Sequence, residues 1–285
     1  MAAESAAEAR ARRAGKPQSR WLGDLATLGV AFGILGAVYL LPADTSLSEV
    51  QRIGALTACT PTSYPPLVTG NADEPGFDVE VLREVARRLG VRFVINTNPA
   101  IGADFNPRSW RLTRAQCQVI AGGVVMSRNV QSFLDTVPTP LGTGWAVVSP
   151  QPVDSLEGLN VGFFAGLTGL DRIGLGRTLR DAGARVRIFS SAAQLESAIA
   201  AGEVDAGVTE TLAARGLGGE NDWTVQLMPE GIERYQLGFG IWRGDLTLLK
   251  AIEGAIAAMQ REGFLDALAE KYDIAPVSGT LGVPA

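Results

Sequence analysis

Residues 185–209, RVRIFSSAAQLESAIAAGEVDAGVT, contain the pattern that decides the fold class. The first five residues of this stretch predict a strand. Ser190 or Ser191 predicts the N-cap of a helix over 192–201. Val204–Thr209 predicts the strand that follows this helix. A strand, a helix and a second strand in succession favour parallel pairing, with the helix packed on one face of a sheet.

The same alternation of strands and helices extends on both sides of this stretch, from Arg52 to Lys271. Two such sets predict an α/β fold of two lobes, with mostly parallel sheets and a ligand cleft between the lobes. The other predicted strands are Ile53–Cys59, Val91–Ile95, Val119–Ala121, Val161–Phe164 and Leu237–Trp242. One predicted helix begins with Asp78 as its N-cap, and another extends from the Gly166–Gly169 turn to about Ala182. Two further helices cover Thr247–Lys271, with Gly263 between them.

The composition excludes several classes of protein. Of the 285 residues 46% are hydrophobic, which argues against disorder. The chain has no histidine, so Ser-His-Asp and Cys-His catalysis and His-ligated zinc are excluded. Two cysteines by themselves hold neither a structural zinc ion nor an iron–sulfur cluster. The net charge of −5 gives no support for a nucleic-acid partner. We expect no metal, no cofactor and no nucleic acid.

The N-terminal region has the pattern of a membrane anchor. Residues 1–20 contain five basic and two acidic side chains, and the seventeen residues Leu25–Leu41 carry no charge. At 1.5 Å per residue this uncharged run is roughly 26 Å long, close to the thickness of the hydrocarbon core. We therefore predict a cytoplasmic basic tail over 1–20 and an uncleaved transmembrane helix over 21–43. The body then lies outside the plasma (inner) membrane, in the periplasm or extracellular space.

Two further readings concern this segment. A cleaved signal peptide is the alternative to an anchor, although Leu41 stands where a small residue is expected three positions before the cut. Gly29, Gly33 and Ala37 form a small-xxx-small stripe that is typical of paired membrane helices, so an anchor-mediated dimer is a further hypothesis.

A series of short motifs follows in a fixed order over residues 52–274. These are Tyr64-Pro65-Pro66-Leu67 with Gly76-Phe77-Asp78-Val79, Val119-Ile120-Ala121-Gly122 followed by Arg128, Leu156-Glu157-Gly158-Leu159 with Ala165-Gly166-Leu167-Thr168-Gly169, Ala200-Ala201-Gly202-Glu203-Val204-Asp205-Ala206 followed by Glu210, and Leu237-Gly238-Phe239-Gly240-Ile241 with Gly263-Phe264. In this order and spacing the chain resembles the extracellular solute-binding proteins of family 3, the polar amino-acid receptors of ABC importers.

The resemblance implies a two-lobed periplasmic-binding-protein type 2 fold. Lobe 1 would comprise residues 50–144 plus 238–285, and lobe 2 would comprise 148–234. The implied function is capture of a small carboxylate-bearing, amino-acid-like ligand by hinge closure, with an ABC permease as the protein partner and no enzymatic activity.

The resemblance also assigns ligand-binding roles to individual residues. Arg128 would bind the ligand carboxylate through two parallel hydrogen bonds, with Ser127 directly before it as a further ligand-binding residue. The turn that contains Thr168 would add helix N-terminal donors. Glu210 would bind the ligand ammonium, and Tyr64 would offer its ring face. Trp145 would line the cleft near the hinge. Each has an ordinary structural alternative: a surface arginine, a helix N-cap, a helix-start carboxylate, a packed loop tyrosine and a packing tryptophan.

Three positions depart from the family pattern. Val124 and Met126 stand where the family usually has Ser or Thr, whose hydroxyls help to hold the ligand, and Glu210 stands where Asp is more common. These differences favour a ligand that is less polar, or anchored differently, than an ordinary α-amino acid.

Two other functions stay open. Some proteins of this fold serve periplasmic dehydrogenase systems as interaction, assembly or sensor modules, and the sequence from Cys117 to Gly122 is similar to theirs. A cyclohexadienyl dehydratase-like enzyme is the third hypothesis, in which Glu210 would act as the acid.

The sequence leaves the state of the two cysteines open. An oxidising compartment favours a disulfide between Cys59 and Cys117. However, one cysteine ends a predicted strand and the other begins one, so in parallel strands they would lie at opposite ends, beyond the ~7 Å between Cα atoms that a disulfide spans.

Overall fold

The computed structural model describes residues 18–39, 44–101, 110–167, 169–228 and 234–274. The chain divides into two units, Met1–Ala43 and Asp44–Ala285. The first unit contains the helix α2 (Gln18–Tyr39). Across the described ranges, no helix combines the length and the apolar character that a membrane crossing requires. The anchor of 21–43 and its pairing therefore stay predictions.

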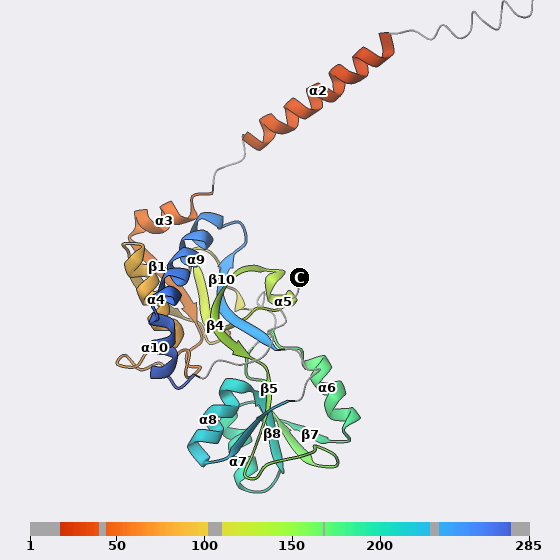
Figure 1. Cartoon of the computed structure of the whole chain (residues 1–285), viewed down its shortest axis with the longest axis vertical. Coiled ribbons are helices and arrows are strands. Elements are labelled where there is room, and N and C mark those ends of the chain that lie inside the picture. The colour runs from red at the N-terminus through yellow and green to blue at the C-terminus, as the bar shows by residue number, and fades with distance from the viewer. Residues whose placement is uncertain (1–17, 40–43, 102–109, 168, 229–233, 275–285) are drawn as a thin grey trace, which may run out of the picture. The chain divides into compact units, whose positions relative to one another are not determined.

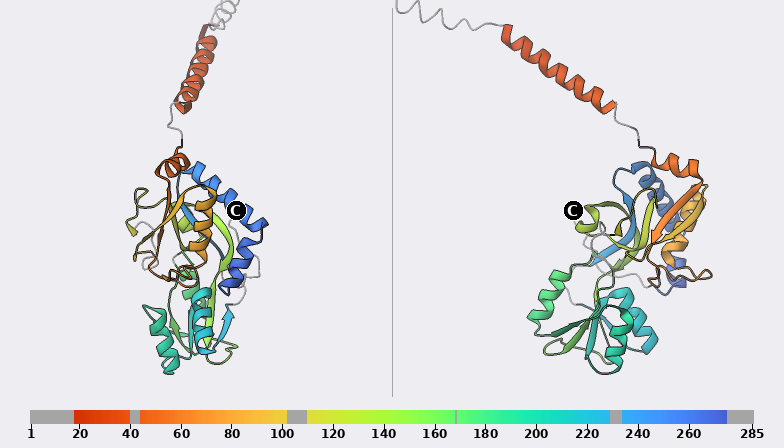
Figure 2. Two further views of the ribbon diagram at one scale, coloured as in Figure 1. Left: turned by 90° about the vertical axis from the view of Figure 1, so that its left-hand side faces the viewer. Right: turned by 180° about the vertical axis from the view of Figure 1, so that it is seen from behind.

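The second unit, shown in Figures 1 and 2, contains two mixed five-stranded sheets. The first sheet has the order β2-β1-β3-β10-β4, in which β10 is antiparallel to both of its neighbours. The second has the order β7-β6-β8-β5-β9, in which β5 is antiparallel to both neighbours. The strands of the first sheet are β1 (Ala55–Thr60), β2 (Arg92–Thr97), β3 (Val119–Val125), β4 (Leu134–Thr143) and β10 (Tyr235–Trp242); those of the second are β5 (Trp145–Ser149), β6 (Asn160–Phe163), β7 (Arg185–Ile188), β8 (Ala206–Glu210) and β9 (Thr224–Leu227).

Helices pack on both sheets, as the strand–helix alternation predicts. In the first lobe, α4 and α9 pack against each other and against the sheet, where their apolar side chains join the core. In the second lobe, α7 and α8 cover the sheet, and Leu195, Ile199 and Leu217 fill a separate cluster. The helices of the body are α3 (Ser46–Ile53), α4 (Phe77–Arg88), α5 (Arg128–Gln131), α6 (Arg172–Asp181), α7 (Ala192–Ala200), α8 (Thr211–Asn221), α9 (Leu246–Arg261) and α10 (Phe264–Lys271).

The chain passes between the sheets at Gly144, which separates β4 from β5. Thr211 of the second lobe fixes this crossing, because its N–H donates to the Gly144 carbonyl at 2.9 Å and its Oγ1 accepts from the Gly144 N–H at 3.2 Å. The return crossing lies between β9 and β10, mostly within residues 229–233, outside the described ranges. The two-lobed α/β architecture is therefore confirmed, whereas the residue bounds of the lobes stay a prediction.

Three details of the sequence prediction are wrong. The sheets are mixed, because the strand that directly follows each crossing inserts antiparallel: β5 in the second sheet and β10 in the first. The strand at Val119 extends to Val125 and is buried throughout, although Gly122 and Gly123 interrupt its apolar pattern. The helix predicted with Asp78 as its N-cap begins two residues earlier, with Gly76 as N-cap, and the Asp78 side chain points inward.

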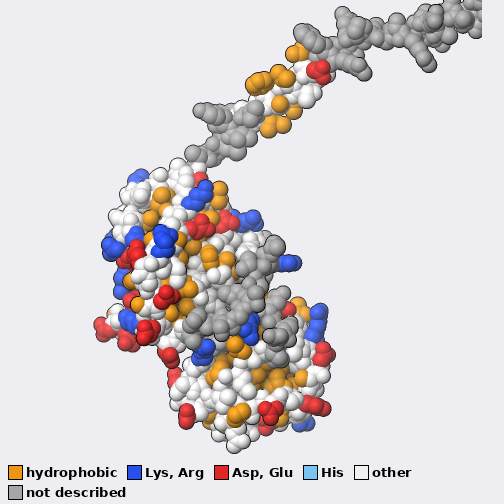
Figure 3. Space-filling model, viewed as in Figure 1, with side chains coloured by type: hydrophobic (Ala, Val, Ile, Leu, Met, Phe, Trp, Pro, Cys, Tyr) orange, Lys and Arg blue, Asp and Glu red, His pale blue; other side chains and the backbone are white. Residues whose placement is uncertain are grey.

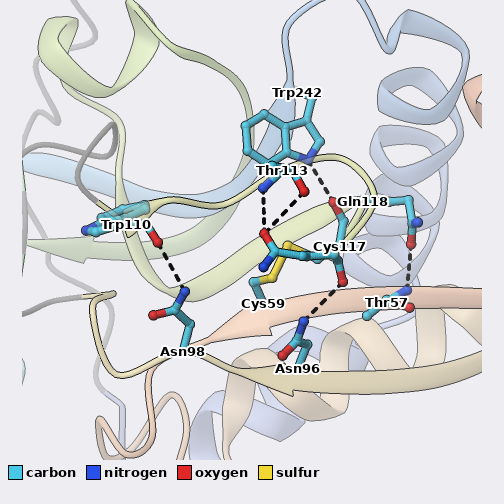
Figure 4. Close-up of a disulfide and its surroundings, with 10 residues drawn as sticks. Thr57, Cys59, Asn96, Asn98, Trp110, Thr113, Cys117, Gln118 and Trp242 are labelled. Atoms are coloured by element: carbon cyan, nitrogen blue, oxygen red, sulfur yellow. Dashed lines mark hydrogen bonds between the residues drawn. A yellow bond between two sulfur atoms is a disulfide. The ribbon is translucent and has the colours of Figure 1, made fainter.

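Cys59 and Cys117 form a disulfide with their Cα atoms 5.6 Å apart (Figure 4). The two cysteines do not lie at opposite ends, because the end of β1 pairs with the start of β3, with Cys59 beside Ile120, and Cys117 follows a turn just before β3. The Thr113 carbonyl accepts from the Cys117 N–H, and the Trp242 indole donates to the Cys117 carbonyl at 2.7 Å. Both cysteines are fully buried beside Ile120 and Trp110.

Candidate ligand-binding site

Glu210 is a fully buried carboxylate at the point where β8 ends and α8 begins. Its Oε1 accepts from the Ala213 N–H at 2.5 Å, and its Oε2 accepts from the Leu212 N–H at 3.0 Å. The side chain is thus the N-cap of α8, a position that favours a negative charge. Burial raises the pKa of Glu210, and its hydrogen bonds oppose that rise.

Two side chains from the first lobe complete the surroundings of Glu210. The Thr143 hydroxyl, at the end of β4, donates to Oε2 at 2.7 Å. The Tyr64 hydroxyl donates to Oε1 at 2.5 Å. Burial and the neighbouring carboxylate raise the pKa of Tyr64 well above its ordinary value, so the phenol stays a donor. Two residues that sequence analysis assigned to the ligand therefore bind each other.

Tyr64 reaches Glu210 from a tight loop that follows β1. The Tyr64 carbonyl accepts from the N–H groups of Leu67 and Val68, and the Tyr64 N–H donates back to the Val68 carbonyl at 2.6 Å. This short closed loop fixes the ring in place. Because β1 belongs to the first sheet and Glu210 to the second, the Tyr64–Glu210 bond joins the two lobes.

The glycine turn after β6 lies against both lobes. A Cβ added to Gly166 would lie 2.4 Å from Glu210 Cγ and 3.1 Å from the Tyr64 hydroxyl oxygen, and its φ of +61° also suits glycine. A Cβ at Gly169 would lie 3.1 Å from Ser127 Oγ. The turn therefore spans the distance between Glu210 and the start of α5. Thr168, predicted to bind ligand here, is outside the described residues.

Ser127 and Arg128 lie at the carboxyl end of β3. Ser127 is buried and is the N-cap of α5, where its Oγ accepts from the Val130 N–H at 3.5 Å. Arg128 is the first residue of α5 and is exposed. Within the described ranges its guanidinium has no hydrogen-bond or ion-pair partner. The side chain is thus available to an anion.

Trp145 packs inside the second lobe and leaves little surface for a ligand. It is 2% exposed, its indole N–H donates to the Asp171 carbonyl at 3.1 Å, and its ring lies 5.5 Å from that of Phe163. Its polar atom already has a partner, so the packing alternative describes it well.

Asp78 is a site residue that the sequence analysis assigned only to a helix cap. It is 3% exposed, and its Oδ2 accepts from the N–H groups of Gly122 at 2.8 Å and Gly123 at 3.2 Å. Both glycines have φ near +90°, so Asp78 fixes an unusual backbone at the end of β3, a few residues before Arg128. Its place between Phe77 and Val79 was the signal in the sequence.

Asp78 gives a pH-dependent prediction. Burial raises its pKa from 3.8 to about 7, against the effect of the two N–H donors. Between these values the folded chain keeps a proton that the unfolded chain has lost, so the contribution of Asp78 to stability falls as pH rises from about 4 to about 7. Asp78→Asn keeps an acceptor oxygen and cannot ionise. We expect the melting temperature of this variant, relative to the parent, to rise over that range.

Thermal melts from pH 4.5 to pH 8 measure this difference. Glu84→Gln is the matched control, because hydrogen bonds from Arg87 lower the pKa of Glu84 to about 2, so its ionisation is complete throughout the range. If the melting-temperature difference between Asp78→Asn and the parent stays constant with pH, the raised pKa of Asp78 is contradicted.

The described residues contain no group of three or more His, Cys, Asp or Glu side chains that could hold a metal ion. Lys and Arg are mixed with Asp and Glu over the described side chains of the face in Figure 3, with no basic patch there.

The family model of the bacterial extracellular solute-binding proteins, family 3, matches residues 56–274. The chain belongs to this family. The match starts within β1 and ends just after α10, so it includes both sheets and every described candidate residue. The resemblance found in the sequence motifs is thereby confirmed.

Individual relatives agree with this assignment. The L-cystine-binding protein TcyJ of Escherichia coli K12 is 27% identical over 246 residues, which cover 79% of this chain and 85% of TcyJ. An arginine-binding protein from T. maritima has 22% identity and a TM-score of 0.62, over 81% of this chain and 100% of its own. A substrate-binding protein of a Streptococcus pneumoniae ABC uptake transporter, with bound histidine, has 16% identity and a TM-score of 0.64. The match covers 82% of this chain and 98% of that protein. These two structures share the fold.

Proposed function

We propose that this protein is an extracytoplasmic receptor that captures a small, carboxylate-bearing, amino-acid-like solute between its two lobes and presents it to an ABC permease. Membership of the solute-binding family supports the binding role, and relatives named for cystine, arginine and histidine support an amino-acid-like solute. The permease is the partner that the family implies.

The single observation that carries the proposal is the exposed Arg128 guanidinium at the carboxyl end of β3, which has no partner among the residues that the structure describes. In α/β sheets ligands collect at this edge, and a guanidinium binds a carboxylate through two parallel hydrogen bonds. The neighbouring Ser127 approaches Gly169 of the second lobe, so a carboxylate on Arg128 would lie where the lobes meet. Closure of the lobes about Gly144 would then exclude water from it.

We propose no catalytic role for the protein. The acid that a dehydratase-like reaction would need is Glu210, and both oxygens of that carboxylate already accept hydrogen bonds from the chain itself. The family and its named relatives are binding proteins, which agrees with this reading.

We further propose that the N-terminal segment holds the body at the outer face of the plasma membrane. The support is the basic tail followed by the uncharged Leu25–Leu41 run. N-terminal sequencing of the membrane-extracted protein should begin near Met1, whereas a mature chain that starts near Asp44 would replace the anchor with a cleaved signal.

Thermal melting with a panel of small carboxylates tests the binding role. The panel contains the common amino acids, cystine and simple organic acids. A ligand that binds only the folded chain raises the melting temperature as its concentration increases. At a ligand concentration one hundred times Kd, the free energy of unfolding increases by about 2.7 kcal/mol. We expect the compounds of one chemical class in the panel to raise the melting temperature. No shift with any member at millimolar concentration would argue against the proposed function.

A further inference from the structure

The Glu210 carboxylate has no open acceptor position. An ionised carboxylate offers about four lone-pair sites, two on each oxygen. In the structure Oε1 accepts from Tyr64 and Ala213, and Oε2 accepts from Thr143 and Leu212. A ligand ammonium could therefore bind this carboxylate only by displacing one of the four donors.

Of these four donors, Tyr64 is the one that can leave at low cost to the fold. Leu212 and Ala213 donate from the first turn of the helix that Glu210 caps, so they move with it. Thr143 precedes Gly144, and the hydrogen bonds between Gly144 and Thr211 tie that segment to the second lobe. Tyr64 comes from the first lobe, 146 residues away in sequence, and moves independently of α8.

We infer that the Tyr64 hydroxyl is a specificity-determining group that takes the position of a ligand ammonium on Glu210, so that the lobes close without ligand and the site favours carboxylates that lack an α-ammonium. The second part of this inference rests on the proposed function. It agrees with Val124, near the carboxyl end of β3, and Met126, directly after it, which stand where the family usually has Ser or Thr.

The ring of Tyr64 fits this role because it is held independently of its hydroxyl. The backbone bonds with Val68 fix the loop, and Gly166 gives the hydroxyl room beside Glu210. Tyr64→Phe therefore removes the donor and keeps the ring. One acceptor position on buried Oε1 is then left unsatisfied in the closed state, while in the open state water can reach it.

Small-angle X-ray scattering of the full chain without ligand is the first test. Hydrogen bonds to charged groups typically shift an equilibrium by about tenfold or more. We expect the parent to be closed and Tyr64→Phe to have a larger radius of gyration. Tyr272→Phe is the matched control, because the Tyr272 hydroxyl donates to Glu80 within the first lobe alone. Equal radii for the parent and Tyr64→Phe would overturn the inference.

Calorimetric titration with matched probes is the second test. The pairs are L-arginine with 5-guanidinopentanoate, and L-histidine with 3-(imidazol-4-yl)propanoate, which differ only in the α-ammonium. We expect the parent to prefer the deaminated member, and Tyr64→Phe to shift the preference toward the amino acid by about tenfold or more. The inference is overturned if the parent binds the amino acid more tightly than its deaminated partner and Tyr64→Phe shows the same ratio of the two affinities. If no probe binds either protein, the proposed function loses support, and the scattering comparison still decides the inference.

Discussion

Replacing Arg128 by alanine is expected to weaken ligand binding by roughly thirty- to several-thousand-fold. Removing one member of a desolvated charge pair typically weakens the binding free energy by ~2–5 kcal/mol. Each ~1.4 kcal/mol corresponds to a factor of ten in affinity. Arg128 is exposed and has no partner within the described residues, so its removal leaves no buried group unsatisfied. The loss is therefore expected in binding and not in folding.

Calorimetric titration with the solute identified in the thermal panel measures this loss, and circular dichroism confirms that the variant is folded. Arg128→Lys should also bind more weakly, because an ammonium cannot reproduce the two parallel hydrogen bonds. Arg92→Ala, an exposed arginine on the edge strand β2, is the control and should bind as the parent does. If Arg128→Ala binds within threefold of the parent, Arg128 is a surface residue.

Removal of the disulfide is expected to have the largest effect on stability. Cys59 and Cys117 are 58 residues apart, and a crosslink over a loop of this length stabilises the folded state by roughly 4 kcal/mol, mainly because it restricts the unfolded chain. For a body of this size the double variant Cys59→Ala/Cys117→Ala should melt about 8–16 °C lower.

Scanning calorimetry of the full chain measures this shift. The parent with excess reductant should approach the melting temperature of the double variant, whereas reductant should leave the double variant unchanged. Alanine is chosen because both positions are fully buried and a serine hydroxyl would be left without a partner there. A double variant that melts within 3 °C of the parent would contradict the expected role of the crosslink.

Much of the fold could be predicted because its helices and strands have regular local patterns. The Ser191 N-cap, the helix that ends at Ala200 and the strand that follows are close to their predicted places, since their capping and apolar spacing are local properties. The strand β4 was missed because Pro138 and Pro140 interrupt it. β4 lies at the edge of the first sheet, where proline is tolerated.

The disulfide shows why local patterns do not determine a tertiary contact. Cys117 was predicted to begin a strand, whereas it follows the turn from Thr113, and the start of β3 pairs with the end of β1 at Cys59. Nothing in the spacing of the two cysteines encodes that turn.

The candidate site was predicted in part. The family resemblance led to Tyr64 and Glu210, and the structure places them together. Their mutual hydrogen bond could not be predicted, because 146 residues separate them and they belong to different lobes. Ser127 and Arg128 lie at the expected sheet edge, whereas Trp145 belongs to the core of the second lobe. The ligand roles of these residues stay predictions.

Native mass spectrometry of the full chain, purified in detergent without added solute, tests the central claim of ligand capture most directly. The account predicts a fraction of the protein that carries one small molecule, released on denaturation, whose mass and chemistry identify a carboxylate. That molecule should rebind to the parent and not to Arg128→Ala. Protein that retains no small molecule, and gains none from the carboxylate panel, would contradict the account.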